Sequence, residues 1–207
     1  MNKKRIYFFI KRIIDIVLSL LAVFLLIIPG IIIAIFIKID SKGSIFFKQR
    51  RIGKNKKYFI IYKFRTMRSD TPTNIPTHLL ENPDFYITRV GKILRRTSLD
   101  ELPQIINILK GDMSIVGPRP ALWNQEDLIL ERDKYGANNI RPGLTGLAQI
   151  NGRDELEISE KAKLDGEYVK NMSFSSDLKI FVSTIFKVLK HEGIMEGNAV
   201  NKEKNIR

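Results

Sequence analysis

Asp100 and Glu101 are adjacent carboxylates that stand just before Pro103 and a short apolar segment. Proline is tolerated in the first turn of a helix, so a helix is expected to begin near Leu99 or Asp100. The positive end of the helix dipole would keep a carboxylate there ionised, as a nucleophile or a metal ligand requires. Adjacent carboxylates can also hold Mg²⁺ while the metal keeps phosphate and water as its other ligands.

Basic side chains near turns and element ends supply a second part of the candidate site. Guanidinium groups bind phosphate oxygens through a planar fork of donors. Arg119 lies between Pro118 and Pro120, so it has little backbone freedom and loses little entropy on binding. Carboxylates, a metal ion and guanidinium groups together indicate phosphoryl transfer. The candidate phosphate-binding residues are Lys63, Arg95, Arg119 and Arg153.

Each of these features also has a purely structural interpretation. An acidic pair at a helix start commonly does no more than complement the helix dipole, and two prolines can simply stiffen a corner. A second acidic pair, Asp154 and Glu155, follows Arg153, but no helix start or apolar face fixes its position. The pair Asp100 and Glu101 is favoured because basic groups and an apolar helix accompany it.

The elements that carry these residues can be predicted from periodicity. Leu102, Ile105, Ile106 and Leu109 have the spacing of one buried helix face, and Gly111 provides a stop, so the carboxylates are expected at the exposed mouth of a buried helix. Lys63 directly follows the second strand of a basic hairpin, predicted with strands at residues 45–47 and 58–62 and a turn at residues 53–55.

The rest of the chain is predicted to alternate loops and helices. Residues 68–88 form a polar, proline-containing excursion, and residues 141–153 form a loop and short strand whose glycines permit close approach to a ligand. Helices are expected at residues 124–135, 158–171 and 177–190. The last of them has an apolar face that is expected to lie on the core, with a membrane interface as the alternative.

A membrane segment is predicted at residues 16–37, which carry no charged side chain and are long enough to span a bilayer as a helix. Pro29 lies in its middle, where it removes a helical hydrogen bond. Both flanks are basic, which places both ends on the cytoplasmic side. A re-entrant helix-break-helix satisfies both observations, and an ordinary kinked transmembrane helix is an equal alternative. Asp15 is expected to pair with Lys11 or Arg12.

Composition narrows the class of partner. The 207 residues carry a formal net charge of +13, which favours an anionic partner such as a phosphorylated metabolite or an acidic lipid surface. The absence of cysteine excludes disulfides and thiolate metal sites. Nucleic acid is not expected as a partner, because no basic helix with interleaved aromatic residues accompanies the charge. The oligomeric state is left open.

The expected fold class is α+β and mostly helical. Residues 1–40 would form the re-entrant membrane hairpin, residues 41–195 a small cytoplasmic catalytic domain, and residues 196–207 a polar tail. The catalytic domain would contain a short β-hairpin and several helices, some of them lying at the membrane interface.

Several motifs, in this order and spacing, resemble the bacterial sugar transferases known as small monotopic phosphoglycosyl transferases. The resemblance extends over roughly residues 11–193, although Ile28 stands where the family often has serine before the proline. The motifs are K-R-x-x-D before the proline-broken apolar segment, Y-K-F-R-T-M, R-x-T-S-x-D-E-L-P-Q, N-x-L-K-G-D-M-S-I-V-G-P-R-P and R-P-G-L-T-G-x-A-Q-I-N-G-R.

This resemblance implies that a phospho-sugar passes from a UDP-sugar to undecaprenyl phosphate, releasing UMP, as the first membrane step of capsule, exopolysaccharide or glycan assembly. The donor suggested by T-H-L-L-E-N-P and P-A-L-W-N-Q is an N-acetylated hexosamine derivative. Asp100 matches the nucleophile that forms a covalent phosphosugar intermediate, and Glu101 matches the Mg²⁺ ligand beside it. Basic positions around the phosphates are matched by Lys63, Arg95, Arg119 and Arg153, and the rigid turn by Pro118 and Pro120.

The implied location is the cytoplasmic face of the bacterial inner membrane, with both termini cytoplasmic. A non-catalytic basic membrane adaptor is the alternative function. It would explain the charge and the apolar segment, but it leaves Asp100, Glu101 and the basic residues around them unexplained.

Overall fold

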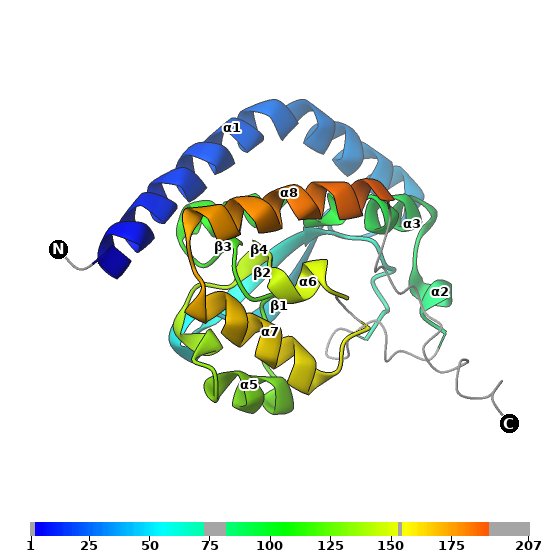
Figure 1. Ribbon diagram of the computed structural model, residues 1–207. Helices are drawn as coiled ribbons and strands as arrows, with labels where there is room; N and C mark the ends of the chain where they lie inside the picture. The colour runs from blue at the N-terminus through cyan, green and yellow to red at the C-terminus, as the bar shows by residue number, and fades with distance from the viewer. Residues whose placement is uncertain (1–2, 73–81, 153–154, 191–207) are drawn as a thin grey trace, which may run out of the picture.

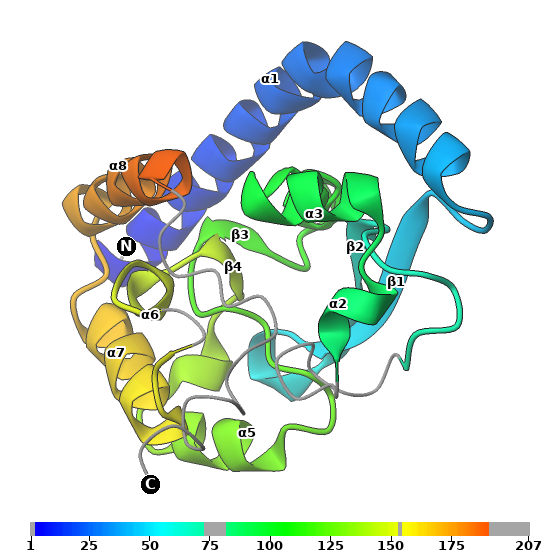
Figure 2. The ribbon, with the colours of Figure 1, turned by 90° about the vertical axis from the view of Figure 1, so that its right-hand side faces the viewer.

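The chain begins with one long helix, α1 (Lys3–Asp40), which arches over the other elements (Figure 1). The computed structural model describes residues 3–72, 82–152 and 155–190, so the expected polar tail at residues 196–207 lies outside it. Pro29 lies inside α1, and the helix bends in its middle (Figure 2). The expected helix-break-helix is thus one bent helix, because a proline removes one helical hydrogen bond and kinks a helix without necessarily ending it.

The N-terminal arm of α1 is anchored by polar contacts to the body of the protein. Lys11 Nζ lies 2.7 Å from Asp177 Oδ2, and Arg12 donates to the carbonyl oxygens of Ile108 and Leu109. Asp15 is buried, and its Oδ1 accepts a hydrogen bond from Ile115 N at 3.0 Å. The expected pairing of Asp15 with a neighbouring base is confirmed only in part, because its hydrogen bond goes to a strand amide, although its charge lies close enough to act on Arg12.

The C-terminal end of α1 is anchored to the same body. Arg65 caps it by donating to the carbonyl oxygens of Lys42 and Ser41 at 2.8 and 2.7 Å. Ile37 packs with two buried side chains, Phe64 at the end of strand β2 (Tyr58–Phe64) and Leu94 in helix α3 (Arg89–Arg96). Asp40 Oδ2 accepts from Val90 N at 2.9 Å. Both ends of α1 are thus held by one group of elements.

Two small sheets form the β structure. Strands β1 (Phe46–Ile52) and β2 (Tyr58–Phe64) form an antiparallel hairpin in which Phe46 pairs with Phe64. β1 is longer than expected, because Lys48 and Arg50 lie on its exposed face and Arg51, on the other face, is held by Pro120 O, so these charges do not interrupt the strand. Strands β3 (Ser114–Val116) and β4 (Gly143–Thr145) pair in parallel.

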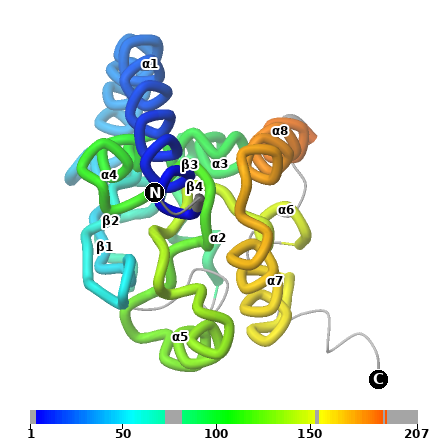
Figure 3. The backbone as a smooth tube through the Cα atoms, turned by 60° about the vertical axis from the view of Figure 1, so that its left-hand side comes forward, coloured from blue at the N-terminus to red at the C-terminus, as the bar shows by residue number. Residues whose placement is uncertain are grey.

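Helices make up most of the remaining described chain, which confirms the mostly helical α+β expectation. Figure 3 shows α1 projecting beyond these helices. The core includes Ile61, Ile108 and Met113, which are buried together where the hairpin, α4 and β3 meet. The helices are α2 (Pro83–Tyr86), α3 (Arg89–Arg96), α4 (Gln104–Lys110), α5 (Glu126–Asp133), α6 (Leu147–Ile150), α7 (Ile158–Lys170) and α8 (Phe174–Lys190).

An apolar face of α8 is exposed. Ile180 is buried against Val116 and Tyr168, whereas Leu178 and Phe186 are 63% and 60% exposed. The expectation that the apolar face of this helix lies on the core is therefore wrong for most of its side chains.

Among the described residues, one helix, at Lys4–Asp40, is long and apolar enough to cross a membrane. Most of its apolar side chains are exposed, as contact with the interior of a bilayer requires.

Candidate active site

Asp100 and Glu101 lie in a 3₁₀ turn, Leu99–Glu101, between α3 and α4. Ser98 has a left-handed conformation with φ of 55°, and α4 begins only at Gln104. The expected helix start at Leu99 or Asp100 is therefore wrong, because Ser98 turns the chain and the 3₁₀ turn precedes the helix. Asp100 and Glu101 are only 9% and 8% exposed, so they do not form an exposed mouth.

Asn107 connects α4 to the hairpin that carries Lys63. Its side chain is fully buried, accepts from Tyr62 N at 3.0 Å and donates to the Ile60 carbonyl oxygen at 2.7 Å. These bonds fix the edge of β2 beside the 3₁₀ turn. Asn107 and Ile108 take buried positions on α4 while Ile106 is 44% exposed, so the expected apolar face is partly wrong. Asn107 was missed, although a polar residue inside an apolar helix was the available signal.

Lys63 projects from β2 between the two carboxylates. Its Nζ lies 2.7 Å from Glu101 Oε1 and 3.8 Å from Asp100 Oδ2. Burial lowers the pKa of Lys63, and the charges of Glu101 and Asp100 oppose this shift. Lys63 therefore forms its close ion pair with Glu101 and a longer contact with Asp100.

Burial raises the pKa of Asp100 above its ordinary value. The charge of Lys63 opposes this shift most strongly, Glu101 reinforces it, and Arg95 and Arg119 oppose it more weakly. The structure therefore brings Arg95, in the last turn of α3, into the electrostatic environment of Asp100. Arg153 and Asp154 lie outside the described residues.

Arg119, in the turn that follows β3, contacts the same carboxylate of Glu101 as Lys63 does. Arg119 Nη2 lies 2.7 Å from Glu101 Oε1, and Nη1 lies 3.4 Å from Oε2, which is the geometry of a guanidinium fork. Two carboxylates and three basic side chains thus share one buried site. Such a site can hold the phosphates of a substrate while a carboxylate attacks.

Three carbonyl groups hold the turn that presents Arg119. Pro118 O accepts from Gly143 N at 2.8 Å, Arg119 O accepts from Arg132 Nη1 at 2.9 Å, and Pro120 O accepts from Arg51 Nη1 at 3.0 Å. The rigidity of the turn therefore comes from donors on distant segments as well as from its prolines. Sequence reasoning missed Arg132 and Arg51, because nothing local links them to this turn.

The glycines after Arg141 serve strand packing. A Cβ atom on Gly143 would lie 2.1 Å from Gly117 N and 2.6 Å from Gly117 O. Only glycine therefore allows β4 to pass this close to the start of the turn. At Gly143 the group that approaches closely is the backbone of Gly117, where the sequence had suggested a ligand.

Comparisons of the sequence with known proteins place the chain in a family. The family model described as bacterial sugar transferase matches residues 6–191. The chain belongs to the bacterial sugar transferase family. The expected family, and with it an enzymatic role for the chain, is confirmed.

Three relatives illustrate how far the similarity extends along this sugar transferase. The uncharacterized sugar transferase EpsL of Bacillus subtilis is 41% identical over 198 residues, which cover 94% of this chain and 95% of EpsL. The UDP-glucose:undecaprenyl-phosphate glucose-1-phosphate transferase of Escherichia coli is 43% identical over 186 residues, 86% of this chain but 40% of that protein. The UDP-N-acetylgalactosamine-undecaprenyl-phosphate N-acetylgalactosaminephosphotransferase of Aeromonas hydrophila is 38% identical over 190 residues, 89% of this chain and 44% of that protein.

The carboxylates of this sugar transferase fit a Mg²⁺ ion that also binds substrate. In the part of the chain that the structure describes, no three His, Cys, Asp or Glu side chains gather around one point. Mg²⁺ commonly binds one or two carboxylates and completes its shell with phosphate oxygens and water. Glu101 Oε1 already receives Lys63 and Arg119. Glu101 Oε2 also accepts from Arg119 Nη1, at 3.4 Å, whereas the ion pair of Asp100 Oδ2 with Lys63 Nζ is longer, at 3.8 Å, so the Asp100 oxygens are the donors that best fit the ion.

Proposed function

We propose that this sugar transferase moves a sugar 1-phosphate from a UDP-sugar to undecaprenyl phosphate, as the first membrane step of capsule, exopolysaccharide or glycan assembly. The observation that carries the proposal is the buried pair Asp100 and Glu101, which faces Lys63 and Arg119. The names of the Escherichia coli and Aeromonas hydrophila relatives support the acceptor and the transferred group. An N-acetylated hexosamine is the donor sugar we propose, with glucose as its competitor.

The chemistry divides into two displacements at phosphorus. An Asp100 oxygen attacks the β-phosphate of the UDP-sugar, the bond from that phosphorus to the bridging oxygen breaks, and UMP leaves with the bond electrons. A phosphate oxygen of undecaprenyl phosphate then attacks the aspartyl phosphosugar, releasing the Asp100 carboxylate and forming the diphosphate link. A covalent intermediate lets one small site serve a soluble donor and a lipid acceptor in turn.

The basic residues have roles that follow from their contacts. Lys63 and Arg119, which balance Glu101, would share their charge with the incoming diphosphate, and Arg95 would add donors around it. The family resemblance assigns the same role to Arg153, which lies outside the described residues. Asp100 and Glu101 would hold Mg²⁺, which when bound neutralises phosphate charge and polarises the reacting phosphoryl group.

We also propose that α1 is re-entrant and that the site works at the cytoplasmic face of the inner membrane. The support is that Asp15 and Arg12 near one end of α1, and Asp40 at the other, contact the same body. A helix that crossed the bilayer would carry its two ends to opposite sides. The exposed apolar side chains of α8 would then lie against the same leaflet.

The reaction is tested by incubating the purified protein with undecaprenyl phosphate and one UDP-sugar at a time. We expect UMP release with one N-acetylated donor, lost when EDTA removes Mg²⁺ and restored when Mg²⁺ is added back. UMP release with UDP-glucose alone would correct the donor. Strong binding to anionic liposomes without UMP release from any UDP-sugar would instead favour a membrane adaptor.

The topology is tested with a cysteine tag at either terminus, since the chain has no cysteine of its own. Both tags are expected to react with a membrane-impermeant thiol reagent only after the inner membrane is opened. An N-terminal tag that reacts from the periplasm in intact spheroplasts would show that α1 crosses the membrane.

A further inference from the structure

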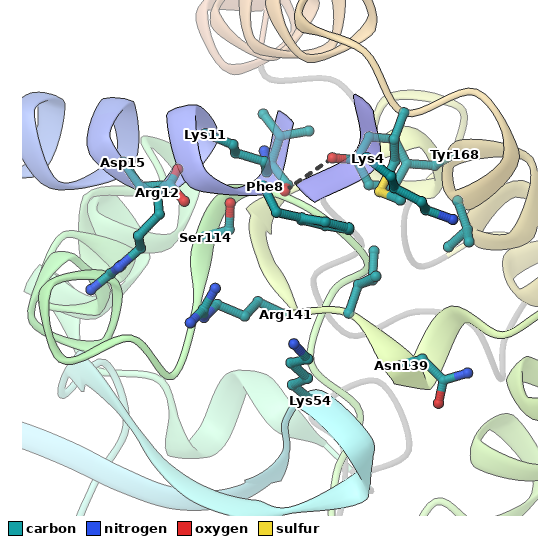
Figure 4. A pocket seen from close by; sticks show the side chains of 14 residues that line it. Lys4, Phe8, Lys11, Arg12, Asp15, Lys54, Ser114, Asn139, Arg141 and Tyr168 are labelled. Carbon is teal, nitrogen blue, oxygen red and sulfur yellow. Dashed lines mark hydrogen bonds between the residues drawn. The ribbon is translucent and has the colours of Figure 1, made fainter. Parts of the chain in front are cut away.

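A cavity of about 260 Å³ lies beneath the first turns of α1, and its lining includes neither Asp100 nor Glu101 (Figure 4). Its walls come from α1, the hairpin turn, β3, α7 and the segment before β4. Lys54 points from the hairpin turn toward Arg141, and Phe8 projects into the same space from α1. The basic side chains of the lining are Lys4, Lys11, Arg12, Lys54 and Arg141.

Positive charge exceeds negative charge in this lining. Lys11 is balanced by Asp177, but Arg12 and Arg141 meet only carbonyl oxygens in their described hydrogen bonds, at the C-terminal end of α4. The acidic residue of the lining, Asp15, uses Oδ1 to accept from Ile115 N. An anion in the cavity would therefore meet an excess of cationic groups.

Ser114 provides an independent sign of an incomplete polar site. Its side chain is 2% exposed and lies in the wall of the cavity. Within the described residues its Oγ has no hydrogen-bond partner, although buried hydroxyl groups are nearly always bonded. A polar ligand, or water that it brings, could satisfy this hydroxyl.

The helix above the cavity indicates which anion would reach it. On the same turns of α1 that carry Lys4 and Lys11, Phe8 lines the cavity and the adjacent Phe9 is 64% exposed. An amphiphile can place a phosphate among the basic groups and its acyl chains along these apolar side chains. We propose that the cavity binds the headgroup phosphate of an anionic phospholipid.

Free phosphate offers the same chemistry, so the test compares both sources. The full-length protein is held in phosphatidylcholine nanodiscs, and short-chain phosphatidylglycerol or inorganic phosphate is titrated while the Tm is followed. Lys54→Gln removes one exposed lysine that lines the cavity. Lys57→Gln removes an exposed lysine from the same hairpin turn that does not line it, and serves as the matched control.

We expect phosphatidylglycerol to raise the Tm of the wild-type protein, and Lys54→Gln to weaken its apparent affinity about five-fold relative to Lys57→Gln. Arg141→Gln should weaken it at least as much. Equal affinities for Lys54→Gln and Lys57→Gln would overturn the site. A response to inorganic phosphate but not to the lipid would keep the phosphate site and overturn the phospholipid. Displacement of the lipid by a polyprenyl phosphate would make the cavity an acceptor site and also overturn the assignment.

Discussion

Asp100→Asn is expected to lower UMP release at least about a thousand-fold, because an amide cannot replace the carboxylate as a nucleophile. The substitution preserves the size of the side chain. Without acceptor, a donor labelled in its sugar should label the wild-type protein in a single turnover and leave Asp100→Asn unlabelled. Turnover close to that of the wild type would show that Asp100 is not the nucleophile.

The same substitution should maintain or raise the Tm at neutral pH. Burial raises the pKa of Asp100, so the folded state disfavours its ionised form. The stability linked to this shift is present below the pKa of the unfolded chain and is lost as pH rises through the folded pKa. The Tm advantage of Asp100→Asn should therefore shrink as the pH is lowered.

Glu101→Gln is the matched control for this effect. Its carboxylate is held by Lys63 Nζ and Arg119 Nη2, each at 2.7 Å. Neutralising Glu101 removes these two close ion pairs inside a buried site, so the Tm should fall. A lower Tm for both variants would contradict the proposed difference between the two carboxylates.

Arg132→Met is expected to cause a large loss of stability. Arg132 Nε and Nη2 lie 2.8 and 2.6 Å from Asp165 Oδ2, and the two residues are 5% and 1% exposed. Removing one partner leaves a buried charge without compensation, which typically costs about 3–5 kcal/mol. For a chain of this size the Tm should fall by roughly 10 °C.

A double variant tests whether the loss of stability in Arg132→Met comes from the unpaired charge of Asp165. In Arg132→Met/Asp165→Leu both charges are removed, so most of the lost Tm should return, because apolar pairs often replace buried ion pairs without a net loss. Lys134→Met, an exposed change just after α5, should leave the Tm unchanged. If the double variant had the same low Tm as Arg132→Met alone, the unpaired charge of Asp165 would not be the cause of the lost stability.

Activity in the double variant reports on the Arg119 turn. Arg132 Nη1 donates to Arg119 O, and methionine cannot supply this bond. We therefore expect the recovered Tm to be accompanied by a raised KM for the UDP-sugar. An unchanged KM would show that the remaining bonds of the turn are sufficient to hold Arg119.

Local patterns were enough to predict several elements. The hairpin, α5, α7 and α8 follow from short-range periodicity and turn residues, and the observed helices lie at or within a few residues of the expected ranges. The parallel pairing of β3 with β4 was not predicted. A short strand was expected within residues 141–153, where β4 lies, but three residues carry too little pattern to identify a pairing partner that is distant in the chain.

The sequence by itself determined that two adjacent carboxylates, a proline-bounded arginine and a lysine after a strand are present, and that an apolar helix precedes them. Only the tertiary structure decided that Glu101 takes the close contacts and Asp100 the longer one. It also decided that Asn107 and Arg132 hold the segments around them. The physical reason is that these contacts join residues far apart in the chain, and burial, which sets their strength and the pKa of Asp100, depends on the whole fold.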